Sequence, residues 1–76
     1  MTEAQEVYQD LMVQVLKLRK QLRDQRVQKV LAKLANTRDK GAYVRHLQAD
    51  LEQQLQKSHR NNEEIDNLLE ILEDLV

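Results

Sequence analysis

The chain contains one glycine, Gly41, and no proline, and this distribution constrains its fold more than any other feature of the sequence. Proline would interrupt a helix, whereas glycine allows the positive φ angle that a sharp turn needs. Periodic apolar residues continue on both sides of Gly41, and the residues just before it, Asn36 to Lys40, favour turns. We therefore predict a helix over residues 2–36, a turn over 37–41 and a helix over 42–76.

The composition favours an all-α fold. Aromatic residues make up only 3% of the chain and charged residues 33%, and most of the remainder are good helix formers. Aliphatic residues at heptad spacing are typical of coiled coils and helical bundles. The prediction is a single domain over residues 1–76, an antiparallel two-helix hairpin resembling a coiled coil. Because such a hairpin buries little apolar surface and no cysteine is present for disulfides, we expect it to assemble into a helical bundle with another chain.

The first predicted helix carries a heptad seam in its N-terminal half. Thr2 and Gln5 have the spacing of a capping box, so the helix should begin at Thr2. The seam alternates steps of four and three residues: Ala4, Tyr8, Leu11, Val15, Leu18 and Leu22. Met12 and Leu16 widen this stripe, which indicates contact with more than one helix. After Leu22 the register slips, so we expect some helix irregularity over residues 24–28.

The second half keeps one heptad register to its end, but its middle is polar. Gln54, Ser58 and Asn61 occupy seam positions, and buried polar residues at such positions tend to fix register or partner. Two alternatives stay open. Asn61 followed by Glu64 resembles a helix N-cap, which would make residues 62–76 a third helix, and one glycine does not forbid a continuous helix. In the hairpin, the core near the turn should contain Val27, Leu31, Leu34, Val44, Leu47 and Leu51.

Charge is strongly segregated along the chain, although the net charge is only −1. Residues 17–45 hold ten basic residues against Asp24 and Asp39, whereas residues 63–76 hold six acids and no lysine or arginine. The basic set is the candidate anion-binding site, because its potentials add there: Lys17, Arg19, Lys20, Arg23, Arg26, Lys29, Lys33, Arg38, Lys40 and Arg45. The acids at the end of the second helix lie where negative charge is mildly unfavourable, so we expect another interaction to favour them.

The sequence shows no pattern for catalysis or for binding a cofactor or metal. A single glycine cannot form a phosphate-binding loop of the known types. Ser58 and His59 are neighbours and would point about 100° apart on a helix, so they do not form a nucleophile and base. His46 with Asp50 could share a helix face, but two ligands without a third make a weak metal site. We expect no enzyme activity, no cofactor and no metal.

The leading hypothesis is a non-enzymatic module for protein–protein interaction or oligomerisation, acting as a small subunit, adaptor or chaperone of a larger assembly. Its partner would be a second copy or another helical protein, bound at the open end of the hairpin. The predicted partner-binding residues are Tyr8, Leu11, Met12, Val15, Leu16, Leu18, Ile65, Leu68, Leu69, Leu72 and Leu75. The alternative is a nucleic-acid-associated regulatory protein that uses the basic segment 17–45.

The location is predicted to be cytoplasmic. No apolar stretch approaches the length of a membrane span. The N-terminus, Met1-Thr2-Glu3, is acidic where a secretory signal would be basic. The absence of cysteine suits a reducing compartment.

Overall fold

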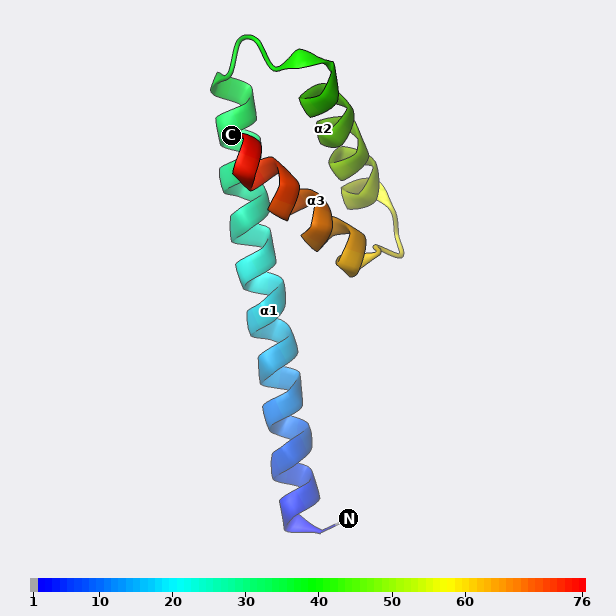
Figure 1. The fold of residues 1–76 in the computed structure, drawn as a ribbon. Coiled ribbons are helices and arrows are strands. Elements are labelled where there is room, and N and C mark those ends of the chain that lie inside the picture. The colour runs from blue at the N-terminus through cyan, green and yellow to red at the C-terminus, as the bar shows by residue number, and fades with distance from the viewer. Residues whose placement is uncertain (1) are drawn as a thin grey trace.

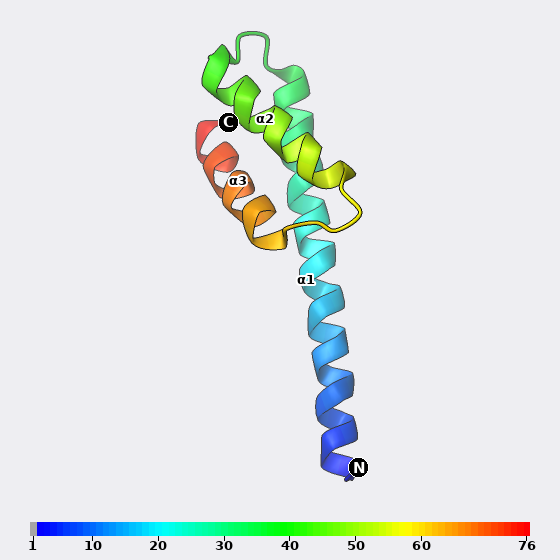
Figure 2. The same ribbon diagram turned by 90° about the vertical axis from the view of Figure 1, so that its right-hand side faces the viewer.

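The computed structural model describes residues 2–76 and contains three helices over that range: α1 (Glu3–Asn36), α2 (Gly41–Gln56) and α3 (Asn62–Leu75). The predicted all-α class is therefore confirmed. Helix α2 runs back in the opposite direction to α1, and α3 then reverses direction again and packs against both (Figures 1 and 2). The N-terminal half of α1 projects away from this cluster, so the molecule is elongated, with extents of 57 × 20 × 16 Å.

The prediction of one continuous helix over residues 42–76 is wrong, and with it the two-helix hairpin. Helix α2 ends at Gln56; the next residue, Lys57, has an extended backbone, and α3 begins after Asn61. The Asn61 side chain accepts a hydrogen bond of 3.1 Å from the Glu64 N–H and so caps the new helix. The three-helix alternative is the observed arrangement, and two of the polar seam residues, Ser58 and Asn61, lie in the break.

Both ends of α1 follow the sequence signals. The capping box is confirmed: Thr2 Oγ1 accepts from the Gln5 N–H at 3.3 Å, and Gln5 Oε1 accepts from the Thr2 N–H at 3.1 Å. After Asn36 the chain leaves the helix, and Gly41 has a φ of 73°, a value that L-residues rarely adopt. The predicted turn over 37–41 is therefore present, and Gly41 is also the first residue of α2.

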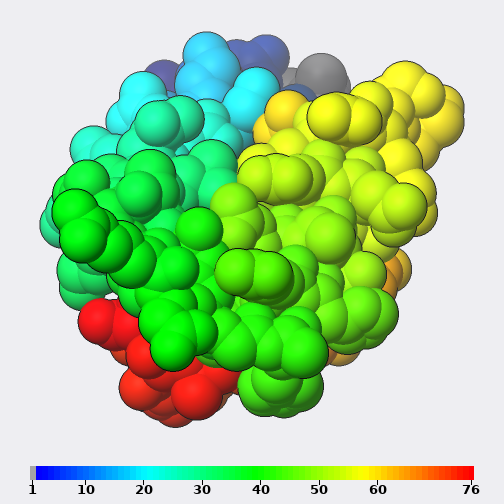
Figure 3. Space-filling model, turned by 90° about the horizontal axis from the view of Figure 1, so that it is seen from above, coloured from blue at the N-terminus to red at the C-terminus, as the bar shows by residue number. Residues whose placement is uncertain are grey.

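The hydrophobic core lies where the three helices meet, and α3 supplies the largest share of it. We call this part of the molecule the head: residues 27–36 of α1 together with α2 and α3. Its buried apolar side chains are Val27, Val30 and Leu34 from α1, Leu47 and Leu51 from α2, and Ile65, Leu68, Leu69 and Leu72 from α3. Leu31 and Val44 pack against this core while half-buried. Figure 3 looks onto this end of the molecule, where the α1–α2 connection, α2 and the chain's C-terminus close around it.

Gln54 is the one polar residue buried within residues 2–76. Its Nε2 donates a hydrogen bond of 2.9 Å to Glu64 Oε2, which joins the last turn of α2 to the first turn of α3. Its Oε1 has no hydrogen-bond partner in the part of the chain that the structure describes. The polar seam position thus connects two helices of the same chain across the break.

Two ion pairs attach the acidic helix α3 to the basic part of α1. Arg23 donates to Asp66 through Nε at 2.8 Å and through Nη2 at 3.2 Å, and Arg26 Nε lies 3.2 and 3.3 Å from the two carboxylate oxygens of Glu73. These hydrogen bonds are the main reason that the pKa values of Asp66 and Glu73 lie below their ordinary values. The Arg26–Glu73 pair accounts for one of the acids at the end of the last helix that the sequence left unexplained.

Removal of a core leucine from α3 should destabilise the head. Leu72 is fully buried, so Leu72→Ala is expected to lower the free energy of unfolding by about 2–5 kcal/mol. Urea unfolding followed by circular dichroism measures this change. Leu75→Ala is the matched control, because Leu75 is 48% exposed on the same helix and should cost far less. Equal losses for the two variants would contradict the assignment of this core.

The α1–α3 ion pairs should make the fold acid-sensitive. Because the folded pKa values of Asp66 and Glu73 are lowered, their stabilisation is complete above the unfolded pKa of about 4 and is lost as pH falls through the folded values. Between pH 7 and pH 3 the native chain should lose on the order of 1 kcal/mol more stability than the double variant Arg23→Gln/Arg26→Gln. Urea unfolding at each pH measures the difference.

Asp74→Asn provides the control for this comparison, since Asp74 is exposed on α3 and makes no ion pair with any of the described residues. It should retain the acid sensitivity of the native chain. The same acid loss in the native chain and in the double arginine variant would show that these pairs contribute nothing.

Candidate helix-packing interface

The N-terminal half of α1 carries a long apolar face that no other part of the described chain covers. We call residues 3–22 the arm; at 1.5 Å per residue it is about 30 Å long. None of its side chains is buried or half-buried, and its backbone projects away from the other helices (Figures 1 and 2). Its large apolar side chains are 40–65% exposed: Val7, Tyr8, Leu11, Met12, Val13, Val15, Leu16, Leu18 and Leu22. Monomeric soluble proteins rarely expose a contiguous apolar surface of this extent.

The heptad seam of the arm points in a different direction from the core face of the same helix. Successive residues of an α-helix are rotated by about 100°, so the stripe through Leu11 and Val15 lies roughly 100° around the helix from the stripe through Val30 and Leu34. Helix α1 is nevertheless α-helical without interruption from Glu3 to Asn36, so the predicted irregularity over 24–28 is wrong. The register slip in the sequence is instead the point where one packing face ends and another begins.

The predicted partner-binding residues separate into two groups. Six lie on the arm and are exposed: Tyr8, Leu11, Met12, Val15, Leu16 and Leu18. Four others are part of the core of the head, which contradicts their assignment to an open binding face: Ile65, Leu68, Leu69 and Leu72. The reason is that α3 folds back onto α1 and α2 and leaves no open end. Leu75, at the end of α3, stays 48% exposed.

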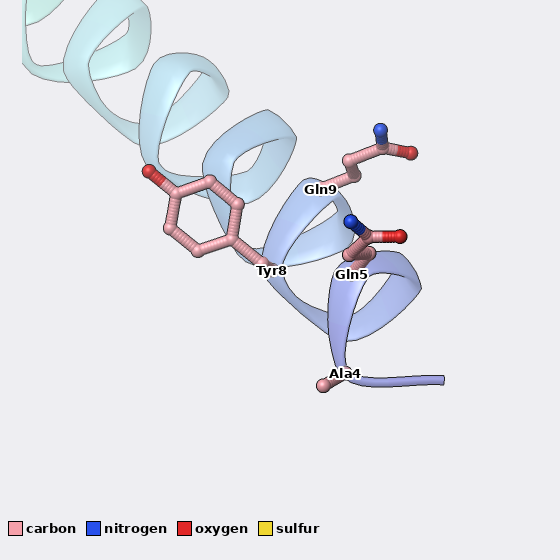
Figure 4. A pocket seen from close by; sticks show the side chains of 4 residues that line it. All are labelled: Ala4, Gln5, Tyr8 and Gln9. Carbon is pink, nitrogen blue, oxygen red and sulfur yellow. The ribbon is translucent and has the colours of Figure 1, made fainter. Parts of the chain in front are cut away.

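The surface beside Tyr8 is slightly hollowed. A shallow depression there is lined by Ala4, Gln5, Tyr8 and Gln9. Figure 4 shows the Tyr8 ring lying along the side of the helix, with Gln5 and Gln9 projecting from the neighbouring side. All four residues belong to one helix, so the depression has no second wall and does not enclose a small molecule. Spaces of this kind between residues of one helix receive the side chains of a facing helix.

The ten predicted anion-binding residues do not form one patch. Arg23 and Arg26 are engaged by the acids of α3. A hollow between α1 and the α2–α3 connection gathers Arg19, Lys20 and Arg23, and the connection adds His59 and Arg60, which the sequence prediction had not included. Asp24, Ser58, Asn62 and Leu16 complete its lining. Arg38, Lys40 and Arg45 lie near the α1–α2 connection at the far end of the head (Figure 1).

Within residues 2–76, no group of three or more histidine, cysteine, aspartate or glutamate side chains is placed to hold a metal ion. His46 Nε2 lies 3.5 Å from Asp50 Oδ2, one helical turn away, and the His46 side chain is largely exposed. This pair is a surface contact between two residues of α2. None of the three described helices combines the length and the apolar character needed to cross a membrane.

Comparison of the chain with family models, with curated proteins and with solved structures gave no match.

Proposed function

We propose that this protein is a non-enzymatic helical interaction module whose arm is the interface. The observation that carries the proposal is the half-exposed apolar face of residues 3–22, which nothing else within residues 2–76 covers. The arm is continuous with a helix that is anchored in a packed core, so it presents this face on a fixed support.

Helix energetics supports a partner for the arm. Most helix stability in proteins comes from the packing of an apolar face and not from the intrinsic helix propensity of the residues. Complete burial of a leucine or valine side chain contributes about 1.5–3 kcal/mol relative to exposure, and the arm leaves much of that unrealised at every seam position. Burial of the seam by a partner would stabilise the helical conformation of the arm, and the same burial would stabilise the complex.

The width of the face indicates the kind of partner. Besides the seam, Val7 lies on one flank and Met12 and Leu16 on the other, so the apolar surface extends over about half of the helix circumference. A face wider than a coiled-coil seam suits contact with two or more helices. We therefore propose a subunit, adaptor or chaperone that completes a helical bundle, and we propose the cytoplasm as its location because the chain has no cysteine.

The alternative role, association with nucleic acid through residues 17–45, has less support. Two of its arginines, Arg23 and Arg26, are committed to ion pairs with α3. The other bases do not gather in one region: Arg19 and Lys20 line the hollow beside the α2–α3 connection, whereas Arg38, Lys40 and Arg45 lie near the α1–α2 connection. The hollow with Arg19, Lys20 and Arg60 is the place where phosphate groups would bind in that case.

Photo-crosslinking in cells tests the arm as an interface. A benzophenone amino acid is incorporated at Leu11, on the seam, and separately at Val13, which is on the opposite side of the same arm and equally exposed. Position 11 should give a discrete crosslinked protein product and position 13 should give little, since Val13 lies outside the apolar half of the arm. Gel mobility and mass spectrometry of the purified products measure the result.

Both outcomes of that experiment are informative. A crosslink from position 11 to a second copy or to another protein supports the proposal equally. Equal labelling from the two positions, or none from position 11, would contradict it.

Fluorescence anisotropy with short duplex and single-stranded oligonucleotides tests the alternative role. If the basic segment binds nucleic acid, the logarithm of the affinity should fall linearly with the logarithm of the salt concentration, and Arg19→Gln/Lys20→Gln should weaken binding. We expect no saturable binding at low salt, and a salt-dependent affinity that this variant reduces would favour the nucleic-acid role instead.

A further inference from the structure

We infer that the arm's apolar face is covered by a second copy of this chain, whose arm packs against it in the antiparallel direction over residues 4–22. This inference rests on the proposed function, in which the arm is the interface, and it adds the identity and orientation of the partner. Three features of the arm support it: the order of residue sizes along the seam, the distribution of charge, and the open approach to its far end.

The seam side chains match well when one arm is reversed against the other. With the two-fold axis near residue 13, Ala4 lies opposite Leu22, Tyr8 opposite Leu18, and Leu11 opposite Val15. The smallest seam residue then faces a large one. A parallel pair in register would place two alanines opposite each other at position 4 and two tyrosines opposite each other at position 8. The alanine layer would then be underfilled and the tyrosine layer crowded.

The charges of the arm also favour the antiparallel direction. Its N-terminal part carries Glu3, Glu6 and Asp10 and no base, whereas residues 17–23 carry Lys17, Arg19, Lys20 and Arg23 and no acid. Reversal places the acids of one copy level with the bases of the other, with Asp10 on the same side of the seam as the other copy's Lys17. A parallel pair would place the two basic segments side by side, each next to a hollow that already holds His59 and Arg60.

The head leaves the seam accessible along its whole length. Leu22, the last seam residue, is 52% exposed although it lies next to the head. Helix α3 packs on the face of α1 that contains Val27, Val30 and Leu34, roughly 100° away from the seam. A second arm can therefore lie along residues 4–22 without displacing α3.

Disulfide trapping tests the orientation, because the native chain has no cysteine and each introduced thiol is the only one present. Ala4→Cys and Leu22→Cys variants of distinguishable mass are mixed as reduced proteins, allowed to exchange, and oxidised. In the antiparallel pair the two positions face each other, so the mixed disulfide should exceed its statistical share. In a parallel pair in register, the thiol at position 4 of one copy and the thiol at position 22 of the other would lie at opposite ends of the arm. They would be too far apart to form a disulfide.

Sedimentation equilibrium of the native chain accompanies this experiment, with Leu11→Asp and the matched control Val13→Asp. The native chain and Val13→Asp should sediment at twice the monomer mass of 9.0 kDa, and Leu11→Asp as a monomer. The core of the head contains neither residue, so unfolding of the head does not confuse the result.

The possible failures are distinguishable. A monomeric native chain at all concentrations, or a predominance of disulfides between identical positions, overturns the antiparallel second copy and leaves the arm as an interface for another protein. A dimer that persists equally in Leu11→Asp and Val13→Asp overturns both the inference and the proposed function.

Discussion

The structure depends on the packing of α3 against the other two helices. Helix α3 supplies four of the buried apolar side chains, and it is the element that contacts both α1 and α2. Without it, the first two helices would expose Leu34, Leu47 and Leu51. The ion pairs from Arg23 and Arg26 fix the register of α3 against α1, because each joins one residue of α3 to one turn of α1. The same packing removes Leu68 and Leu72 from any external binding face.

Local signals in the sequence predicted local structure well. The Thr2 capping box, the turn at Gly41 and the helical character of the chain all follow from residue types whose preferences act over a few positions. The continuous register from Val44 to Leu75 was misleading, because a heptad pattern persists in the sequence whether or not the helix is interrupted. The Asn61 cap and the neighbouring polar residues favour a separate third helix. The capping side chain accepts a hydrogen bond from a backbone N–H that the break would otherwise leave unpaired.

The candidate interface was only half predictable for a related reason. Hydrophobic periodicity identifies which side chains avoid water, but it does not tell whether they are covered by the same chain or by another. Leu11 and Leu72 look equivalent in the sequence, yet one is exposed on the arm and the other is buried in the head. The distinction depends on where the chain reverses, which is a property of the tertiary fold. The slip after Leu22 was the one sequence signal of this difference, because it separates the two faces of α1.

The uninterrupted course of α1 has a mechanical consequence for any complex that the arm forms. Because α1 is one rigid helix, the angle about its axis between the seam of the arm and the buried face at Val27, Val30 and Leu34 is fixed. The number of residues between Leu22 and Val27 therefore determines on which side of α1 a bound helix lies relative to the head. One inserted residue would rotate the partner by about 100° about the axis of α1. Seven inserted residues would nearly restore its original angle and would move it about two helical turns further from the head. Spacing in this short stretch therefore sets the geometry of the whole assembly, even though none of its side chains needs to touch the partner.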